Sequence, residues 1–235
     1  MDDVMLPYRT EWRSLATLLD ILKGKGVDRA NLEARMGAGE SFRETLNAAE
    51  QLNLVRRDDA GEIQLTQQGR RLAYAANDRE RQQELTGAML SYAPYAIPLQ
   101  RALAEDLHLV DGPWVERVWQ VDMRLGQPRN RVEEARTFFF RLADDAGLGS
   151  YHRGVRGQPT RLELSRDARP RLEQVVTVEE HATAEYDAAP APSGSNLPPG
   201  APIALSLSID MSDWELDKIE ALLRLVGVIP AVAHD

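Results

Sequence analysis

A short turn-forming segment lies between two stretches with the pattern of buried structure, in residues 54–72, LVRRDDAGEIQLTQQGRRL. Residues 58–61 supply turn-forming side chains, and apolar and polar residues alternate through residues 62–65 as in a half-buried strand. Thr66 then precedes a helical segment in the position of a capping residue. The pattern predicts a β-hairpin that is followed at once by a helix.

Helical patterns also precede this hairpin. Apolar residues recur through residues 12–22 with the spacing of one helix face, and glycines follow. Asp28 is predicted to cap a short helix, and Ser41 is predicted to open a second helix after a glycine-containing turn. The order helix, helix, helix, strand, strand predicts a winged helix-turn-helix domain over residues 1–80, in which the hairpin is the wing.

The same order of elements recurs in the second half of the chain. Residues 95–107, 113–123 and 129–146 have helical patterns, and a hairpin with a longer Gly-rich turn follows them. The stretches EIQLTQQGRRL and RLELSRDARPRL each contain an alternating strand, a Thr or Ser cap and a helix with arginines. Because a duplicated unit constrains a fold better than one copy does, we predict a second winged helix over residues 81–181. The predicted fold class is mainly α with small β wings (α+β).

Three other segments complete the predicted organisation. SYAPYAIPLQ, residues 91–100, is expected to form the hinge between the two copies, with its tyrosines packed in the core. Residues 182–202 are rich in Pro, Ala, Gly and Ser and are expected to be a linker. Residues 203–235 have the pattern of one strand and one helix, which is too little to fold alone. This unit is expected to dock on the winged helices, or to bind a second copy or a partner protein through residues 203–226.

The segment ANLEARMGAGESFRETLNAAEQLNLVRRDDAGEIQLTQQGRRLAYAANDRERQQEL carries a family resemblance. Its AAEQLNLV and IQLTQQGRRLA motifs and the charged helix after them resemble the AAA-associated C-terminal domain, a winged-helix domain appended to some nitrate and sulfonate transporter ATPases. The resemblance covers about residues 12–105. The ATPase motif G-x-x-x-x-G-K-[ST] is not in the sequence. What the resemblance implies is a bacterial winged-helix module of regulatory or interaction type, with no catalytic residue to carry over.

The composition does not favour an enzyme, a metal centre or a membrane protein. The sequence has no cysteine, and its four histidines, at positions 108, 152, 181 and 234, do not have the spacing of metal ligands. Adjacent acid pairs such as Asp144 and Asp145 point in different directions on a helix. No stretch has the length and apolarity of a membrane span, and the N-terminus lacks the pattern of a signal sequence. We therefore expect a non-enzymatic cytoplasmic protein with no cofactor and no metal.

The net charge of −9, taken for the whole chain, argues against nucleic acid as a partner. However, residues 1–80 have 12 basic and 14 acidic side chains, and residues 81–175 have 14 and 13. Residues 176–235 have 2 and 10, so the acidity belongs mostly to the C-terminal quarter. A nearly neutral domain can still present a basic face.

The second copy contains the predicted site for duplex DNA. Its third helix begins with arginines and an amide, which are bidentate donors suited to a recognition helix in the major groove. Its wing has cations around flexible glycines, as expected of a hairpin along phosphates. The predicted DNA-binding residues are Arg129, Asn130, Arg131, Arg136, His152, Arg153, Arg156 and Arg161. A solvated basic face is the alternative interpretation of these arginines.

The first copy is the weaker candidate for DNA, because carboxylates open its second helix and interrupt its wing. Its possible secondary DNA contacts are Arg43, Asn47, Arg56 and Arg57, although protein contact or dimer packing is the favoured role. The sequence thus predicts a regulatory DNA-binding protein that contacts duplex DNA mainly through the second winged helix. The alternative is a protein-interaction adaptor or a structural subunit of a larger bacterial complex.

Overall fold

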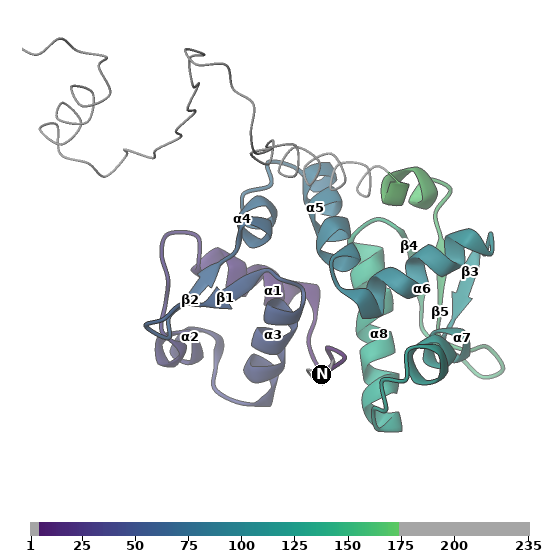
Figure 1. The fold of residues 1–235 in the computed structure, drawn as a ribbon, viewed down its shortest axis with the longest axis horizontal. Coiled ribbons are helices and arrows are strands. Elements are labelled where there is room, and N and C mark those ends of the chain that lie inside the picture. The colour runs from purple at the N-terminus through teal and green to yellow at the C-terminus, as the bar shows by residue number, and fades with distance from the viewer. Residues whose placement is uncertain (1–4, 174–235) are drawn as a thin grey trace, which may run out of the picture. The chain divides into compact units, whose positions relative to one another are not determined.

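The computed structural model describes residues 5–173, which are mainly helical and contain two small antiparallel sheets (Figure 1). All of these residues belong to one compact unit of the chain. The end of the predicted second domain, the predicted linker of residues 182–202 and the predicted strand-helix unit of residues 203–235 lie outside the described residues. Within residues 5–173, no helix combines the length and the apolarity that crossing a membrane requires.

The first half of the described chain consists of helices around a small sheet. Its elements are α1 (Trp12–Ile21), α2 (Arg29–Met36), α3 (Glu40–Gln51), β1 (Val55–Arg57), β2 (Ile63–Leu65) and α4 (Gln67–Ala73). Strands β1 and β2 form the predicted hairpin, with Val55 opposite Leu65. Val27 pairs with Ile63 on the other edge of β2, through two backbone hydrogen bonds of 3.0 and 2.9 Å. A third chain segment therefore extends this hairpin.

Local capping chemistry explains where these helices begin. The Asp28 carboxylate accepts a hydrogen bond from Asn31 N, and Thr66 Oγ1 accepts one from Gly69 N, so both predicted caps are confirmed. The prediction that Ser41 opens α3 is wrong. Gly39, with a φ of 140°, is the N-cap, and α3 begins at Glu40. Glycine adopts a positive φ of this kind readily, whereas other residues do so only at an energetic cost. Gly39 therefore determines where α3 begins.

The second half contains α5 (Asp78–Leu90), α6 (Ala93–Ala104), β3 (Leu109–Asp111), α7 (Gly112–Arg117), the π-helical turn η1 (Val118–Asp122), α8 (Arg129–Asp145), β4 (Gly149–His152) and β5 (Arg161–Leu164). The helices predicted around residues 95–107, 113–123 and 129–146 are confirmed, with small shifts of their ends. Strand β5 lies between β3 and β4 and is antiparallel to both.

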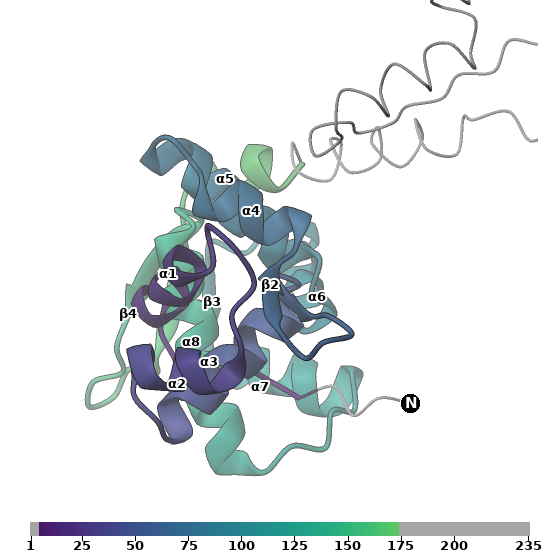
Figure 2. The ribbon, with the colours of Figure 1, turned by 90° about the vertical axis from the view of Figure 1, so that its left-hand side faces the viewer.

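The two halves share an order of elements and a sheet topology. In each half a helix leads to an edge segment, two further helical segments follow, and a hairpin completes the sheet. The second strand of the hairpin is central in both sheets: β2 lies between β1 and Val27, and β5 lies between β4 and β3. Figure 2 shows both halves from the side of the first one.

The segment 91–100 is not the hinge that the sequence suggested, because it forms the start of α6 and is mostly buried. Pro94 is accommodated in the first turn of the helix, where a backbone N–H is not required. Tyr95 is fully buried, and its ring lies edge-to-face with that of Tyr92 at a centroid distance of 5.0 Å. Trp119 Nε1 donates to Pro94 O at 2.6 Å. The core packing predicted for the two tyrosines is confirmed.

Candidate nucleic-acid interface

The N-terminal end of α8 exposes two of the predicted DNA-binding side chains. Pro128 is the N-cap residue and provides no side-chain cap. The Arg129 side chain is 90% exposed, with its Nε 3.1 Å from Glu133 Oε1. Asn130 is exposed beside it. An ion pair at this exposure is weak and opens at little cost, so Arg129 remains accessible to an anion.

Arg131 is directed to the N-terminal segment of the chain. Its guanidinium carbon lies 4.3 Å from the centre of the Tyr8 ring, and its Nη2 donates to Tyr8 Oη at 3.0 Å. A further contact joins Nη1 to Met5 Sδ at 3.5 Å. The structure therefore gives Arg131 a packing role. The Tyr8 ring lies against the face of its guanidinium, and Tyr8 Oη and Met5 Sδ contact the nitrogens at its edge.

Arg136 lies farther along α8 and is held within the fold. Its side chain is 17% exposed and forms an ion pair with Glu116 of α7. The guanidinium also lies against Gly112, where an added Cβ would come within 2.7 Å of Arg136 Nη1. Arg136 therefore holds α7 against α8, and the structure places it away from the exposed end of the helix.

The turn between β4 and β5 carries exposed positive charge. Its residues 153–160 read RGVRGQPT and contain no carboxylate. The side chains of Arg153 and Arg156 are exposed, and neither has an ion-pair partner among residues 5–173. The turn has a defined shape, because Val155 and Gln158 exchange backbone hydrogen bonds of 3.1 and 2.9 Å. Two arginines are thus presented on an ordered hairpin.

The two remaining second-copy residues lie at the base of this turn and are half-buried. His152 Nε2 is 3.4 Å from Glu163 Oε2, and Arg161 Nη1 donates to Gln158 Oε1 at 2.9 Å. These contacts shape the strands that carry the turn. The β4–β5 turn and the N-terminal end of α8 lie in the lower part of the picture in both ribbon views (Figures 1 and 2).

In the first half, α3 and β1 carry the four predicted secondary DNA contacts, and most of their charge is paired with nearby carboxylates. Arg43 Nε lies 3.7 Å from Glu44 Oε1, and Asn47 is half-buried. Arg57 Nε is bound to Glu50 Oε1 at 2.9 Å. Arg56 is exposed and has no ion-pair partner among the described residues. Of the four predicted secondary contacts, Arg56 is the one whose charge is not balanced locally.

Sequence reasoning missed Arg9, which lies in the irregular segment before α1. Its Nη1 donates to Glu40 Oε1 of α3 at 2.6 Å, and its Nε donates to Glu134 Oε2 of α8 at 2.8 Å. Hydrogen bonds to Glu134 and then to Glu40 raise the pKa of Arg9 above its usual value. No pattern in the sequence signals this contact, because Arg9, Glu40 and Glu134 come from three distant parts of the chain. Arg9 joins the two helices that sequence analysis proposed as DNA readers.

Among residues 5–173 there is no group of side chains with the composition and proximity of a metal site. No protein-family model, curated protein or solved structure matches the chain. The resemblance of residues 12–105 to the AAA-associated C-terminal domain stays a prediction.

Proposed function

We propose that the protein is a non-enzymatic, regulatory DNA-binding protein built from two winged helices, and that the second one contacts duplex DNA. The repeated order of elements supports the winged-helix interpretation, because each half ends in a hairpin whose second strand is central in a three-segment sheet. In such domains the third helix enters a groove and the wing lies beside it on the backbone. Here these elements are α8 and the β4–β5 hairpin.

The observation that carries this proposal is the β4–β5 turn. Arg153 and Arg156 are exposed there, in a turn without carboxylates, although the chain as a whole is acidic. Guanidinium groups bind phosphate oxygens through two parallel hydrogen bonds. A turn that keeps two guanidinium groups free of ion pairs within the described residues has the chemistry needed to bind the phosphate backbone of DNA.

The proposal assigns different roles to the predicted residues. Arg129 and Asn130 contact base edges or phosphates at the end of α8, and Arg153 and Arg156 bind phosphates. Arg131 and Arg136 position the helix through Tyr8 and Glu116, respectively, in the contacts described above. Three accessible arginines predict a slope of about −3 for the logarithm of the binding constant against the logarithm of the salt concentration.

Fluorescence anisotropy with duplex DNA across a salt series tests the proposal. The Arg153→Ala/Arg156→Ala protein is compared with Arg79→Ala/Arg166→Ala, which removes the same charge from exposed positions outside the hairpin turn. We expect the turn variant to lose about tenfold or more in affinity and to have a shallower salt slope. The control should bind like the unmodified protein.

Two outcomes contradict the proposal. No binding of the unmodified protein at low salt would exclude duplex DNA as the partner and favour the adaptor interpretation. Equal losses in both variants would mean that overall charge, and not the β4–β5 turn, determines binding.

A further inference from the structure

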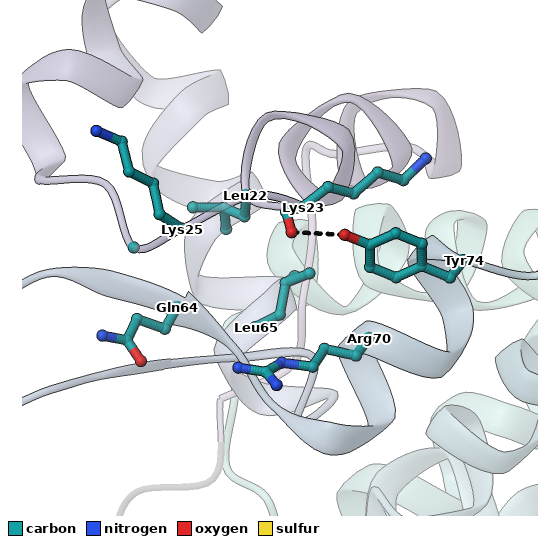
Figure 3. Close-up of a pocket in the computed structure, with 9 residues that line it drawn as sticks. Leu22, Lys23, Lys25, Gln64, Leu65, Arg70 and Tyr74 are labelled. Atoms are coloured by element: carbon teal, nitrogen blue, oxygen red, sulfur yellow. Dashed lines mark hydrogen bonds between the residues drawn. The ribbon is translucent and has the colours of Figure 1, made fainter. Parts of the chain in front are cut away.

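A surface hollow of about 220 Å³ lies in the first half of the chain, apart from α8 and the β4–β5 turn (Figure 3). Three segments line it: the loop of residues 22–26 after α1, the end of β2, and α4 with Tyr74 just beyond its last residue. The lining residues include Lys25, Gln64 and Arg70, and none of them is acidic. The hollow therefore combines a concave shape with one sign of charge.

The loop on one side of the hollow is held at both of its ends. Tyr74 Oη donates to Lys23 O at 2.6 Å, a contact that Figure 3 shows as a dashed line. At the other end, the hydrogen bonds between Val27 and Ile63 join the loop to β2. Gly26 permits this close approach, because an added Cβ would meet Glu62 Oε2 at 2.7 Å and Gln64 Cγ at 2.8 Å. The loop is therefore in place before any ligand arrives, which lowers the entropic cost of binding.

Two cations at this hollow are left without a balancing charge. Lys25 and Arg70 are exposed, and neither has an ion-pair partner among residues 5–173. Lys23 differs, because its Nζ lies 2.9 Å from Asp20 Oδ1 and, in Figure 3, points away from Lys25. Lys25 and Arg70 come from different segments, and in Figure 3 the Lys25 amine extends away from Arg70. Because the Lys25 side chain is exposed and flexible, it has to turn toward Arg70 before both charges can face one ligand.

Asp58 and Glu62, two acidic residues of the β1–β2 hairpin, do not line the hollow. Asp58 accepts hydrogen bonds from Ala60 N, Glu62 N and Gln64 Nε2, which hold the β1–β2 turn. The Glu62 carboxylate lies beside Gly26 but does not line the hollow. The Gln64 amide nitrogen is thus occupied by Asp58, while Lys25 and Arg70 form no ion pair within the described residues.

We propose that this hollow binds the phosphate group of a small molecule. The Arg70 guanidinium binds two phosphate oxygens, and Lys25 supplies a second positive charge, which together suit a dianion. The exposed Tyr74 ring provides apolar surface for the part of the ligand next to the phosphate. The site is separate from the proposed DNA contacts, so the chain has one anion site for DNA and one for a small ligand.

Titration of the full chain with inorganic phosphate at constant ionic strength tests the proposal. Binding is followed through the backbone amide resonances of Lys25, Gly26 and Gln64. The Lys25→Gln/Arg70→Gln protein is compared with Arg35→Gln/Arg79→Gln, which removes the same charge from exposed helix positions. We expect one saturable site, an affinity at least about tenfold lower in the first variant, and no change in the second. A Lys25→Ala/Arg70→Ala protein should behave like the first variant.

The same proteins are also tested against duplex DNA, which separates the two sources of phosphate. We expect both double variants to bind DNA with the same affinity. Shifts that do not saturate, or that are equal in both variants, would overturn the proposal. So would a DNA affinity that only Lys25→Gln/Arg70→Gln lowers, with no phosphate binding, because the hollow would then be a contact for the DNA backbone. The phosphate titration does not depend on DNA binding, so failure of one proposal leaves the other testable.

Discussion

Arg131 of α8 lies over the ring of Tyr8, with its guanidinium carbon 4.3 Å from the ring centre and its Nη2 3.0 Å from Tyr8 Oη. This contact joins residues that are 123 positions apart in the sequence. Nearby, Leu6 is buried, and Tyr92 Oη donates to Met5 O at 2.7 Å. The segment before α1 is therefore packed between the two halves of the described chain.

The pair predicts a measurable coupling in stability. In a double-mutant cycle with Arg131→Ala and Tyr8→Ala, we expect an interaction free energy of about 1 kcal/mol, because the ring and the guanidinium are both partly buried. Urea denaturation of the four proteins measures it. The matched pair Arg129 and Glu133, which is exposed, should give less than about 0.5 kcal/mol. Equal values for the two pairs would contradict the packing role of Arg131.

Trp119 predicts a large loss of stability on truncation. Its side chain is fully buried among aromatic rings, and its Nε1 donates to Pro94 O. We expect Trp119→Ala to lower the free energy of unfolding by about 3–5 kcal/mol. Trp119→Phe should lower it by about 1–3 kcal/mol, because the buried carbonyl loses its donor. Urea denaturation measures both, with the half-buried Trp114→Phe as the control that should cost less.

Gly69 predicts a steric effect at the start of α4. An added Cβ would lie 1.9 Å from Leu54 O, which also accepts a hydrogen bond from Thr66 N at 3.0 Å. We expect Gly69→Ala to destabilise the protein by about 1–3 kcal/mol, because the helix must shift away from the hairpin. Gly24→Ala is the control, since nothing lies within 4 Å of its added Cβ. Similar melting temperatures for the two variants would show that the close approach at Gly69 is unimportant.

Glu84 predicts a dependence of stability on pH. Burial raises the pKa of this carboxyl group above its usual value, against a lowering effect from Arg71. As pH rises past the ordinary Glu pKa of about 4.3, the unfolded chain releases its proton before the folded one does, so stability falls until pH passes the raised pKa. Glu84→Gln should remove this loss. We expect the variant to be more stable than the unmodified protein at pH 7, with a smaller difference at pH 4, measured by urea denaturation.

The predicted helices and hairpins agree with the structure where local chemistry determines them. Asp28 and Thr66 cap helices through atoms three residues away, and the β1–β2 turn is closed by Asp58 and a glycine. Ser41 is the exception, because a glycine just before it determines the start of α3. Caps and turns of this kind can be predicted because their energies depend on neighbours in the sequence.

Some of the arginines predicted as DNA contacts are held by other parts of the protein. Their partners are not neighbours in the sequence, so the sequence pattern did not indicate them. Arg129, Arg153 and Arg156 remain accessible, whereas Arg131 and Arg136 have partners 123 and 20 positions away. Arginines in one motif look alike in a sequence. Only packing determines which of them is left facing solvent.

The order of helices and hairpins, their approximate ends and the repetition of that order follow from residue patterns, because periodicity and capping are local properties. The contacts between distant segments depend on the tertiary structure: Arg9 joins α3 to α8, Arg131 lies over the Tyr8 ring, and Lys25 and Arg70 line one hollow. Each of these arrangements depends on which surfaces the helices bury against one another. That choice is made by the summed packing of residues far apart in the chain, which no single segment of the sequence contains.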